Sequence, residues 1–277
     1  MKMKKLYVSD LDGTLLNTSG VVSEFSRNTI NDLIAKGLNF SIATARTAAT
    51  ANGILAGLDI KEPVILMNGM AIYDLKNKRY IKQHNFTCAQ RDAILDIIET
   101  KKVPAFVYTI QNEELICYTY EDEKLTPEMK YFKDERVVKF NKRFEVIENY
   151  NYLKKFEVIY FTLLGKFDDL SDVKLAIDEV ENVDTLLYLD VYTDDWILEV
   201  HIAGVDKGTA TKELRESTGA DEMLVFVDNT NDIPMMNEAD YSYAVENSKE
   251  NVKLIADEII GNNDEDAVAK KLLKLIK

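Results

Sequence analysis

The feature that most constrains this chain is a short apolar run that ends in two carboxylates. The run Leu6–Val8 leads through Ser9 to Asp10 and Asp12. It is rich in β-formers and too short for a helix, which predicts a buried strand with both acids at its carboxyl end. Residues two apart on a strand point to the same side, so both acids can face one site. In an open parallel sheet, ligands bind at that end of the strands.

The close spacing of these two carboxylates indicates which reactions a site containing them could carry out. Asp10 and Asp12 repel each other, which raises the pKa of at least one of them. A divalent cation would relieve the repulsion and leave one carboxylate as a nucleophile and the other as a proton donor. The alternative is a polar turn after a strand, without function, and three later stretches decide between the two.

The first eighty residues predict an α/β fold. Ser23 is the expected N-cap of a helix at 24–36, and Gly37 is suited to end it. Strands are expected at 38–43 and 63–67, with a helix from about Thr44 to Ala56 between them. Strand, helix, strand, helix, strand is the signature of a parallel sheet with right-handed crossovers. From Gly204 the same pattern resumes, with helices at about 207–218, 250–260 and 264–276 and strands at 223–227 and 241–245.

The middle of the chain predicts a second domain. Hairpins replace the parallel pattern after residue 72, and helices are interleaved with them. Within this region, strands are expected at 105–110, 115–120, 156–164, 186–192 and 196–202, helices at 89–100 and 170–180, and an exposed loop or short helix at 121–130. We therefore expect an inserted α+β domain at 84–192. Residues 1–83 and 193–277 would form the doubly wound parallel-sheet core.

Composition limits the partners. The chain has 277 residues, a net charge of −14 and a pI of about 4.7, which disfavours nucleic acid and acidic membrane surfaces. No apolar stretch reaches 18 residues, and Ser9 and Asp10 interrupt the run behind the basic N-terminus, so neither a membrane span nor a signal peptide is expected. Cys88 and Cys117 have no zinc-site spacing and are expected to be reduced and partly buried. We expect a cytoplasmic protein of unknown oligomeric state.

Three further stretches carry hydroxyl, ammonium or carboxylate groups at the ends of expected strands and helices. Thr44 ends the second expected strand, where its hydroxyl can donate to an anion or serve as a helix N-cap. Lys207 begins a helix, where an ammonium opposes the macrodipole and suits an anionic neighbour. Asp228 ends a strand and Asp232 follows it, within good turn chemistry.

In this order, the four stretches resemble the motifs of the haloacid-dehalogenase superfamily of phosphatases and phosphotransferases. The stretch DLDGTL resembles motif one, DxDGT, and Thr44 is similar to the hydroxyl residue of motif two. Lys207 with Gly208 resembles motif three, and residues 228–232 resemble the GDxxND of motif four. The insert between motifs two and three, together with Met67-Asn68-Gly69, resembles the Cof-type IIB subclass, which acts mostly on sugar phosphates and other small phosphate esters. The resemblance implies a Rossmann-like core with an α+β cap domain.

The resemblance also implies roles for the residues. Asp10 would attack phosphorus to form an aspartyl-phosphate, and Asp12 would act as the general acid and base. Mg²⁺ would be the cofactor, held by the carboxylates of Asp10, Asp228 and Asp232 and by the backbone carbonyl of Asp12.

The same resemblance gives the phosphoryl group its partners. Thr44, Lys207 and Asn231 would bind its oxygens. Arg46 and Asn68 are possible substrate-binding residues, although a surface arginine is an equal alternative for Arg46.

Two residues depart from the family pattern. Ala45 stands where related proteins usually have glycine, which is a mild change. Val227 stands where motif four usually has glycine, and we expect its bulk beside the metal ligand to disturb the geometry.

The sequence therefore predicts a Mg²⁺-dependent phosphate monoester hydrolase that acts on small phosphorylated metabolites. Two alternatives stay open: a phosphomutase or phosphotransferase that uses the same aspartyl-phosphate, and a catalytically weak phosphosugar-binding or regulatory protein. The sequence has no P-loop, no GxGxxG and no GxSxG, so kinase, dehydrogenase and serine-hydrolase functions lack support.

Overall fold

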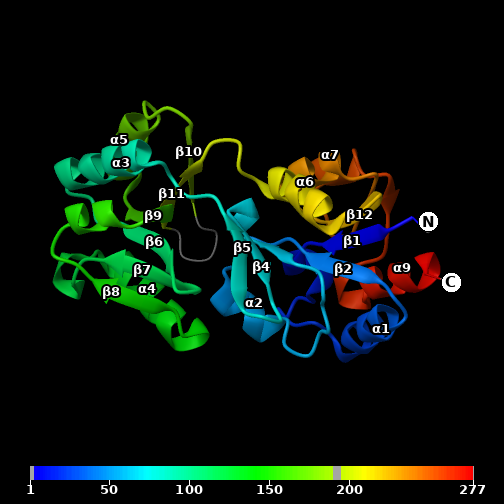
Figure 1. Ribbon diagram of the computed structural model, residues 1–277. Coiled ribbons are helices and arrows are strands. Elements are labelled where there is room, and N and C mark those ends of the chain that lie inside the picture. The colour runs from blue at the N-terminus through cyan, green and yellow to red at the C-terminus, as the bar shows by residue number, and fades with distance from the viewer. Residues whose placement is uncertain (1–2, 190–194, 277) are drawn as a thin grey trace. The chain divides into compact units, whose positions relative to one another are not determined.

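The computed structural model describes residues 3–189 and 195–276, and the chain forms two compact units (Figure 1). One unit combines residues 1–83 with 205–277, and the other is His84–Gly204. The first is the core and the second is the insert.

A parallel sheet forms the centre of the core. Its strand order is β14-β13-β12-β1-β2, and every pair in it is parallel. The strands are β1 (Lys5–Ser9), β2 (Asn39–Ile42), β12 (Glu222–Val227), β13 (Tyr241–Ala244) and β14 (Glu258–Ile259). Strand β3 (Val64–Leu66) continues the parallel arrangement through a bridge between Ala43 and Ile65, and pairs antiparallel with β4 (Ala71–Asp74) and β5 (Arg79–Gln83).

Helices cover both faces of the core sheet, as a doubly wound fold requires. The helices are α1 (Glu24–Ala35), α2 (Ala48–Ile54), α6 (Lys207–Thr218), α7 (Ile233–Glu238), α8 (Glu250–Lys253) and α9 (Ala267–Leu275). Figure 1 shows α6 and α7 above the sheet and α1 and α9 below it. Central strand β1 is buried on both sides, with Leu6, Val8 and Ser9 fully buried, which explains its unbroken apolar run.

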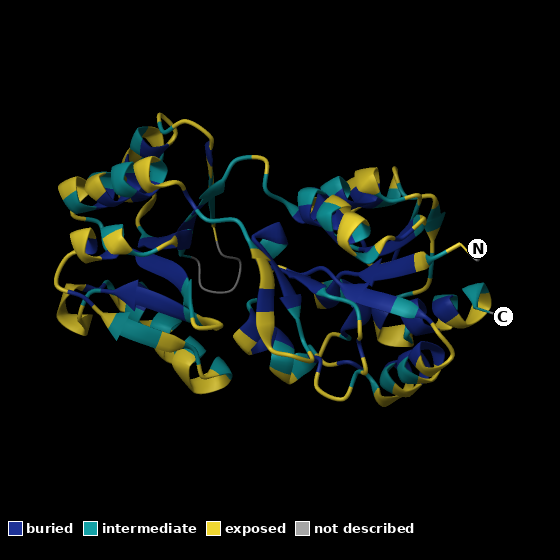
Figure 2. Cartoon of the chain, in the orientation of Figure 1, coloured by how far each residue is buried: buried dark blue, intermediate teal, exposed yellow. Residues whose placement is uncertain are grey.

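The insert is a six-stranded sheet of order β10-β11-β9-β6-β7-β8. Its strands are β6 (Phe106–Gln111), β7 (Glu114–Thr119), β8 (Arg143–Val146), β9 (Val158–Gly165), β10 (Val183–Leu189) and β11 (Trp196–Ile202). Helices α3 (Cys88–Lys101) and α5 (Phe167–Ile177) pack on one face over a shared apolar cluster, and α4 (Pro127–Phe140) packs on the other, where Phe132 stacks on Phe106. Figure 2 shows this sheet largely buried between exposed helix surfaces.

The return from the insert to the core comes later than the sequence predicted. We expected it at residue 193, but the core resumes at Val205. The reason is β11, which pairs antiparallel with both β9 and β10 and so belongs to the insert sheet. The expected connection Thr193–Asp195 lies, except for Asp195, outside the described residues.

Four further expectations need correction. Helix α2 begins at Ala48 rather than at Thr44, and residues 127–140 form a full helix where a loop or short helix was expected. The expected helix at 250–260 ends at Lys253, and Glu258–Ile259 pairs with β13 as the edge strand β14. Both cysteines are free, but Cys88 is exposed and Cys117 is buried, so neither is partly buried.

The fold class is confirmed: an α/β doubly wound core with an inserted α+β unit. Over the described ranges, no helix is long and apolar enough to cross a membrane.

Candidate active site

Strand register brings the candidate residues to one edge of the core sheet. Ser9, the last residue of β1, lies opposite Phe226 of β12 and Ile42 of β2. The backbone N–H of Asp10 donates to the Phe226 carbonyl at 3.0 Å, and that of Ala43 donates to the Ser9 carbonyl at 2.9 Å. The residues that follow these three strands therefore meet at the carboxyl edge, where parallel sheets bind ligands.

A buried lysine joins two of the acids at this edge. The Lys207 ammonium donates to Asp10 Oδ1 at 2.5 Å and to Asp232 Oδ1 at 2.6 Å. The Lys207 side chain is 1% exposed, that of Asp10 is 7% exposed and that of Asp232 is fully buried. Asp228 completes the group, since one carboxylate oxygen from each of the three acids lies within 4.8 Å of the others.

Helix α6 delivers Lys207 to the acids. Asp206 caps the helix by accepting a hydrogen bond from the Thr209 N–H at 2.8 Å, so Lys207 is its first residue. Gly208 lets α6 lie close to α7, because a Cβ at this position would be 2.5 Å from the carbonyl oxygen of Pro234. The lysine-glycine pair thus supplies both the buried cation and the close packing that keeps it in place.

The loop after β12 fixes the other two acids. Asp232 Oδ2 accepts from the backbone N–H groups of Asp228 at 3.1 Å and Asn229 at 3.0 Å. Asp228 Oδ1 accepts from the Thr14 hydroxyl at 2.9 Å, which ties this loop to the loop after β1. Each carboxylate therefore has a fixed orientation before any ligand arrives.

Burial and mutual repulsion shift the ionisation of the cluster. Burial raises the pKa of Asp10 well above its usual range, Lys207 opposes this shift, and Asp232 and Asp228 add to it. The pKa of Asp228 is also raised, first by burial and then by Asp232. Burial lowers the pKa of Lys207, but Asp10 and Asp232 outweigh that effect and raise it overall. One ammonium thus faces three carboxylates, which leaves a local excess of negative charge.

The donor set fits a hard divalent cation. All the candidate ligands are carboxylate oxygens, the donors that Mg²⁺ prefers, and the lysine neutralises only part of their charge. Burial raises the pKa values of Asp10 and Asp228, and the neighbouring acids add to this, so a further positive charge would offset the cost of keeping them ionised. Asp10, Asp228 and Asp232 are therefore the candidate metal ligands. The proposed contribution of the Asp12 carbonyl stays a prediction.

Thr44 is buried at the same edge, and its expected role as a helix N-cap is wrong. The residue before α2 is Thr47, three positions later, and Thr44 Oγ1 instead accepts the Arg46 N–H at 3.1 Å. The Thr44 carbonyl accepts from the backbone N–H of Asn68 at 3.0 Å. Thr44 thus lies in a tight turn between the ends of β2 and β3, where its hydroxyl accepts one hydrogen bond and can also donate one.

The loop after β3 adds an element that sequence reasoning did not predict. Met67, Asn68 and Gly69 all have positive φ, at 51°, 52° and 105°. A Cβ on Gly69 would be 2.1 Å from the Asp206 carbonyl oxygen, so only glycine permits this contact with the start of α6. Such backbone strain is unusual for a bulky residue like Met67 and is typical of functional sites.

This strained loop also places Asn68 beside Asn231. The Asn231 amide donates to Asn68 Oδ1 at 3.1 Å, so two of the candidate ligand-binding residues contact each other. The positive φ of three successive residues has no strong sequence signal except the Asn68-Gly69 pair itself, which is common in turns.

Asp12 and Arg46 form a separate pair. Arg46 Nε donates to Asp12 Oδ2 at 2.7 Å and Arg46 Nη2 donates to Asp12 Oδ1 at 2.6 Å. Asp12 is 52% exposed, in contrast to the buried acids, and the pair raises the pKa of Arg46. The two acids of the opening stretch therefore lie in different environments, one buried against an ammonium and one half-exposed against a guanidinium.

The expected effect of Val227 on the metal geometry stays a prediction. Val227 is fully buried and packs in the apolar cluster of the core with residues such as Val8 and Val225. Its bulk is therefore accommodated within the apolar cluster of the core.

Gly13 offers a sharp test of the geometry around Asp228. Its φ is +80°, and a Cβ there would be 2.5 Å from Asp228 Oδ2. Gly20 has a similar φ of +72° with nothing within 4 Å. We expect Gly13→Ala to lower turnover by roughly a hundredfold, because a ligand is displaced as well as the backbone strained.

Gly20→Ala is the matched control for Gly13→Ala. It carries the backbone strain alone, of about 1–2 kcal/mol, so turnover should stay near that of the wild type while the melting temperature falls. Equal losses of turnover in the two variants would contradict the role given to Asp228.

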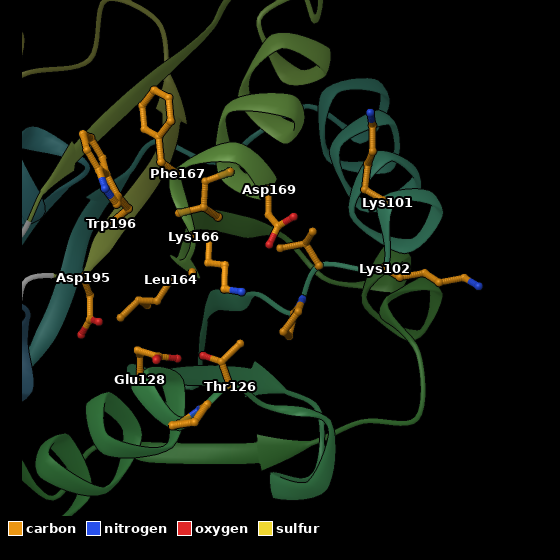
Figure 3. Close-up of a pocket in the computed structure, with 15 residues that line it drawn as sticks. Lys101, Lys102, Thr126, Glu128, Leu164, Lys166, Phe167, Asp169, Asp195 and Trp196 are labelled. Atoms are coloured by element: carbon orange, nitrogen blue, oxygen red, sulfur yellow. The ribbon is translucent and has the colours of Figure 1, made fainter.

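The insert contains a hollow of about 680 Å³ on its own surface (Figure 3). Lys166 and Glu128 extend toward each other in it. Hydrogen bonds from its own backbone and from Thr126 lower the pKa of Glu128, and the charge of Lys166 adds to that shift. Lys101 and Lys102 point away from it. Its charges are mixed and partly paired, and the carboxylate cluster lies in the core unit, so we assign it no catalytic residue.

Comparison with known proteins identifies the family of the chain. The haloacid dehalogenase-like hydrolase family matches residues 7–272. The 5-amino-6-(5-phospho-D-ribitylamino)uracil phosphatase YwtE of Bacillus subtilis is 27% identical over 282 residues, which cover 96% of this chain and 96% of that protein.

Solved structures share the fold over almost the whole chain. The crystal structure of TM0651 from Thermotoga maritima has a TM-score of 0.81 and 25% identity, and the match covers 98% of this chain and 97% of that one. The subclass IIB sugar phosphatase BT4131 has a TM-score of 0.70 and 22% identity, with 98% of both chains covered.

Proposed function

The chain belongs to the haloacid dehalogenase-like hydrolase family, and on that premise we propose that it is a Mg²⁺-dependent phosphate monoester hydrolase for small phosphorylated metabolites. The observation that carries the proposal is the buried Asp10 carboxylate, held by Lys207 at 2.5 Å beside Asp228 and Asp232. A nucleophile for an anionic ester needs a fixed direction and a compensating positive charge, and this arrangement supplies both.

Asp10 is the proposed nucleophile. Lys207 occupies its Oδ1, so Oδ2 is the oxygen left to attack phosphorus in line and form an aspartyl-phosphate. The ester oxygen leaves with a proton from Asp12, which then deprotonates the water that hydrolyses the aspartyl-phosphate. The half-exposed position of Asp12 suits this second role, because a group that exchanges protons needs access to water and substrate.

Thr44, Lys207 and Asn231 are the proposed partners of the phosphoryl oxygens. The Thr44 hydroxyl and the Asn231 amide can donate hydrogen bonds, and the Lys207 ammonium neutralises charge that develops in the transition state. Asn68 contacts Asn231 and would orient its amide. When bound to Asp10, Asp228 and Asp232, Mg²⁺ supplies positive charge that offsets the repulsion between the carboxylates and the anionic ester.

We propose primary phosphates of sugars and polyols as the substrate class. The name of YwtE states that it acts on a ribityl phosphate, which is a primary phosphate of a polyol. The insert would select the leaving group and exclude water. As a handler of small metabolites, the protein would act in the cytoplasm, with neither nucleic acid nor membrane as a partner.

The test is a screen of phosphorylated metabolites with Mg²⁺, with release of inorganic phosphate as the readout and Asp10→Asn as the blank. Phosphate release that Asp10→Asn abolishes supports the proposal. Appearance of an isomeric sugar phosphate would instead identify a mutase or phosphotransferase. Saturable binding of sugar phosphates without turnover would favour the catalytically weak binding protein.

Metal removal gives a second expected result. EDTA should stop phosphate release and Mg²⁺ should restore it. The three carboxylates repel one another and the anionic ester, so the ester can bind only when a cation offsets their charge. Excess Ca²⁺ should inhibit, because it prefers a larger oxygen shell at longer distances and can draw Asp10 away from its line of attack. Activity that survives full chelation, or that Ca²⁺ supports as well as Mg²⁺, would contradict the metal site.

A further inference from the structure

Arg46 contacts the one acid of the opening stretch that the buried cluster leaves out. Its Nε and Nη2 donate to the two oxygens of Asp12 at 2.7 Å and 2.6 Å, a bidentate charge-assisted geometry. We propose that Arg46 is a positioning residue, which fixes the plane of the Asp12 carboxyl group so that its proton is directed at the leaving oxygen. The inference rests on the function proposed above.

The Arg46 backbone is anchored in a way that an ordinary surface arginine is not. Its N–H donates to Thr44 Oγ1 at 3.1 Å, and its carbonyl accepts from the Met67 N–H at 3.1 Å. The strained loop Met67–Gly69 is therefore bonded directly to the turn that carries Arg46. Exposed ion pairs are usually loose, but here the side chain starts from a fixed point and is only 24% exposed.

Asp12 needs such a partner. Asp10, Asp228 and Asp232 each have bonds from other groups at the strand ends. Within the described part of the chain, the Asp12 side chain accepts its hydrogen bonds from Arg46. Gly13 follows Asp12 with φ of +80°, so Asp12 lies on an exposed turn rather than in the packed sheet. Without Arg46, its side chain would be free to rotate between rotamers.

The hydrogen-bonding capacity of Asp12 allows positioning and proton transfer together. A carboxyl group offers about four lone-pair sites, and the guanidinium occupies one on each oxygen. One site on each oxygen remains for the transferable proton. As the bond between phosphorus and the leaving oxygen breaks, that oxygen keeps the bond's electron pair and takes the proton. Asp12 keeps the electron pair of its O–H bond and becomes a carboxylate, and Arg46 touches no reacting atom.

This role predicts a dependence on the leaving group. An alkoxide needs a proton to leave, whereas p-nitrophenolate does not. We expect Arg46→Gln to lower kcat/KM by roughly 10- to 100-fold for an alkyl phosphate, because a misdirected acid loses its alignment, and by less than about threefold for p-nitrophenyl phosphate. The ratio kcat/KM is the right measure, because it reports the step in which the alcohol leaves. Arg46→Lys should recover little, because an ammonium lacks the planar fork.

A double-mutant cycle with Asp12→Asn separates positioning from direct phosphate binding. The substrate is the phosphate of a fluorinated alcohol, whose leaving ability lies between those of the other two esters. If Arg46 acts through Asp12, Arg46→Gln should cause no further loss in the Asp12→Asn background. If Arg46 binds the phosphoryl group itself, the losses of kcat/KM in the two single variants multiply in the double variant. In that case Arg46→Gln also lowers kcat/KM for p-nitrophenyl phosphate as much as for the alkyl ester. Either of those results overturns the inference.

Arg215→Gln is the matched control. Arg215 also pairs with an aspartate, with Nη2 at 2.8 Å from Asp240 Oδ2, but it lies in the last turn of α6, away from Lys207. The Arg215→Gln substitution should leave the ratio of kcat/KM for the alkyl ester to that for the aryl ester unchanged. If the wild type shows no turnover that depends on Asp10, the proposed function and this inference are both overturned. If it does show such turnover but the losses in Arg46→Gln and Asp12→Asn multiply, the inference alone is overturned. A misfolded Arg46→Gln is recognised by its far-UV circular dichroism and its melting temperature, in which case Arg46→Lys takes its place in the cycle.

Discussion

Replacing Asp10 with asparagine is expected to lower phosphate release by roughly a thousandfold or more while the fold stays intact. The amide is nearly isosteric with the carboxylate and its oxygen can still accept the Lys207 hydrogen bond of 2.5 Å. What it lacks is the negative charge that attacks phosphorus. The measurement is the release of inorganic phosphate from the best ester of the screen, with Mg²⁺ present.

The stability of the same variant separates chemistry from folding. Asp10 is buried against Asp228 and Asp232, and its pKa is raised by that burial and by their charges. Its neutral replacement should therefore melt no lower than the wild type. Asp59→Asn removes an exposed charge of the same kind and should keep full activity. An Asp10→Asn variant that retains activity within tenfold of the wild type would refute the proposed nucleophile.

The grouping of the candidate residues is predictable from the sequence because strand ends have strong local signals. Val8 and Val225 belong to apolar runs too short for helices, and each run stops at an acid. Parallel pairing then brings those ends together, as the register of Ser9 with Phe226 shows. Lys207 is predictable for a similar reason, since Asp206 is a good N-cap and fixes the start of the helix.

What the sequence misses depends on contacts between distant segments. The left-handed conformation of Met67 and Asn68 occurs next to the close approach of Gly69 to Asp206, which lies more than a hundred residues away in the sequence. Trp196–Ile202 has the alternation of any strand, and its pairing with β9 and β10 shows that it belongs to the insert. Glu258–Ile259 is too short to carry a periodic signal and is a strand because β13 offers it an edge.

The pairing of Asp12 with Arg46 is a third case. The two residues are 34 positions apart, and each alone has an ordinary explanation as a surface residue. Tertiary structure brings the turn after β1 and the turn after β2 together, and only then does the arginine have a specific partner.

Lys207→Met is expected to lower the free energy of unfolding by about 3–5 kcal/mol at about pH 8, because it removes the cation from a buried ion pair. Lys207 contacts Asp10 and Asp232, all three side chains are almost completely buried, and methionine has a similar length without a charge. Activity should fall as well, since the phosphoryl group loses a cation. Urea unfolding in EDTA measures the loss of stability without interference from metal ions.

The pH dependence of that loss identifies its cause. The pKa of Asp10 is already raised by burial, and removal of Lys207 takes away the charge that opposes the shift. An acid whose pKa is higher in the folded state than in the unfolded state stabilises the fold at low pH, and that stability is lost as the pH rises through its folded pKa. The loss in free energy of unfolding caused by Lys207→Met should therefore be smaller at about pH 5.5 than at about pH 8. Lys5→Met removes a lysine paired with Glu222 on the exposed end of β1 and should change stability little at either pH. A deficit that is independent of pH, or no larger than that of Lys5→Met, would show that Lys207 does not neutralise the buried acids.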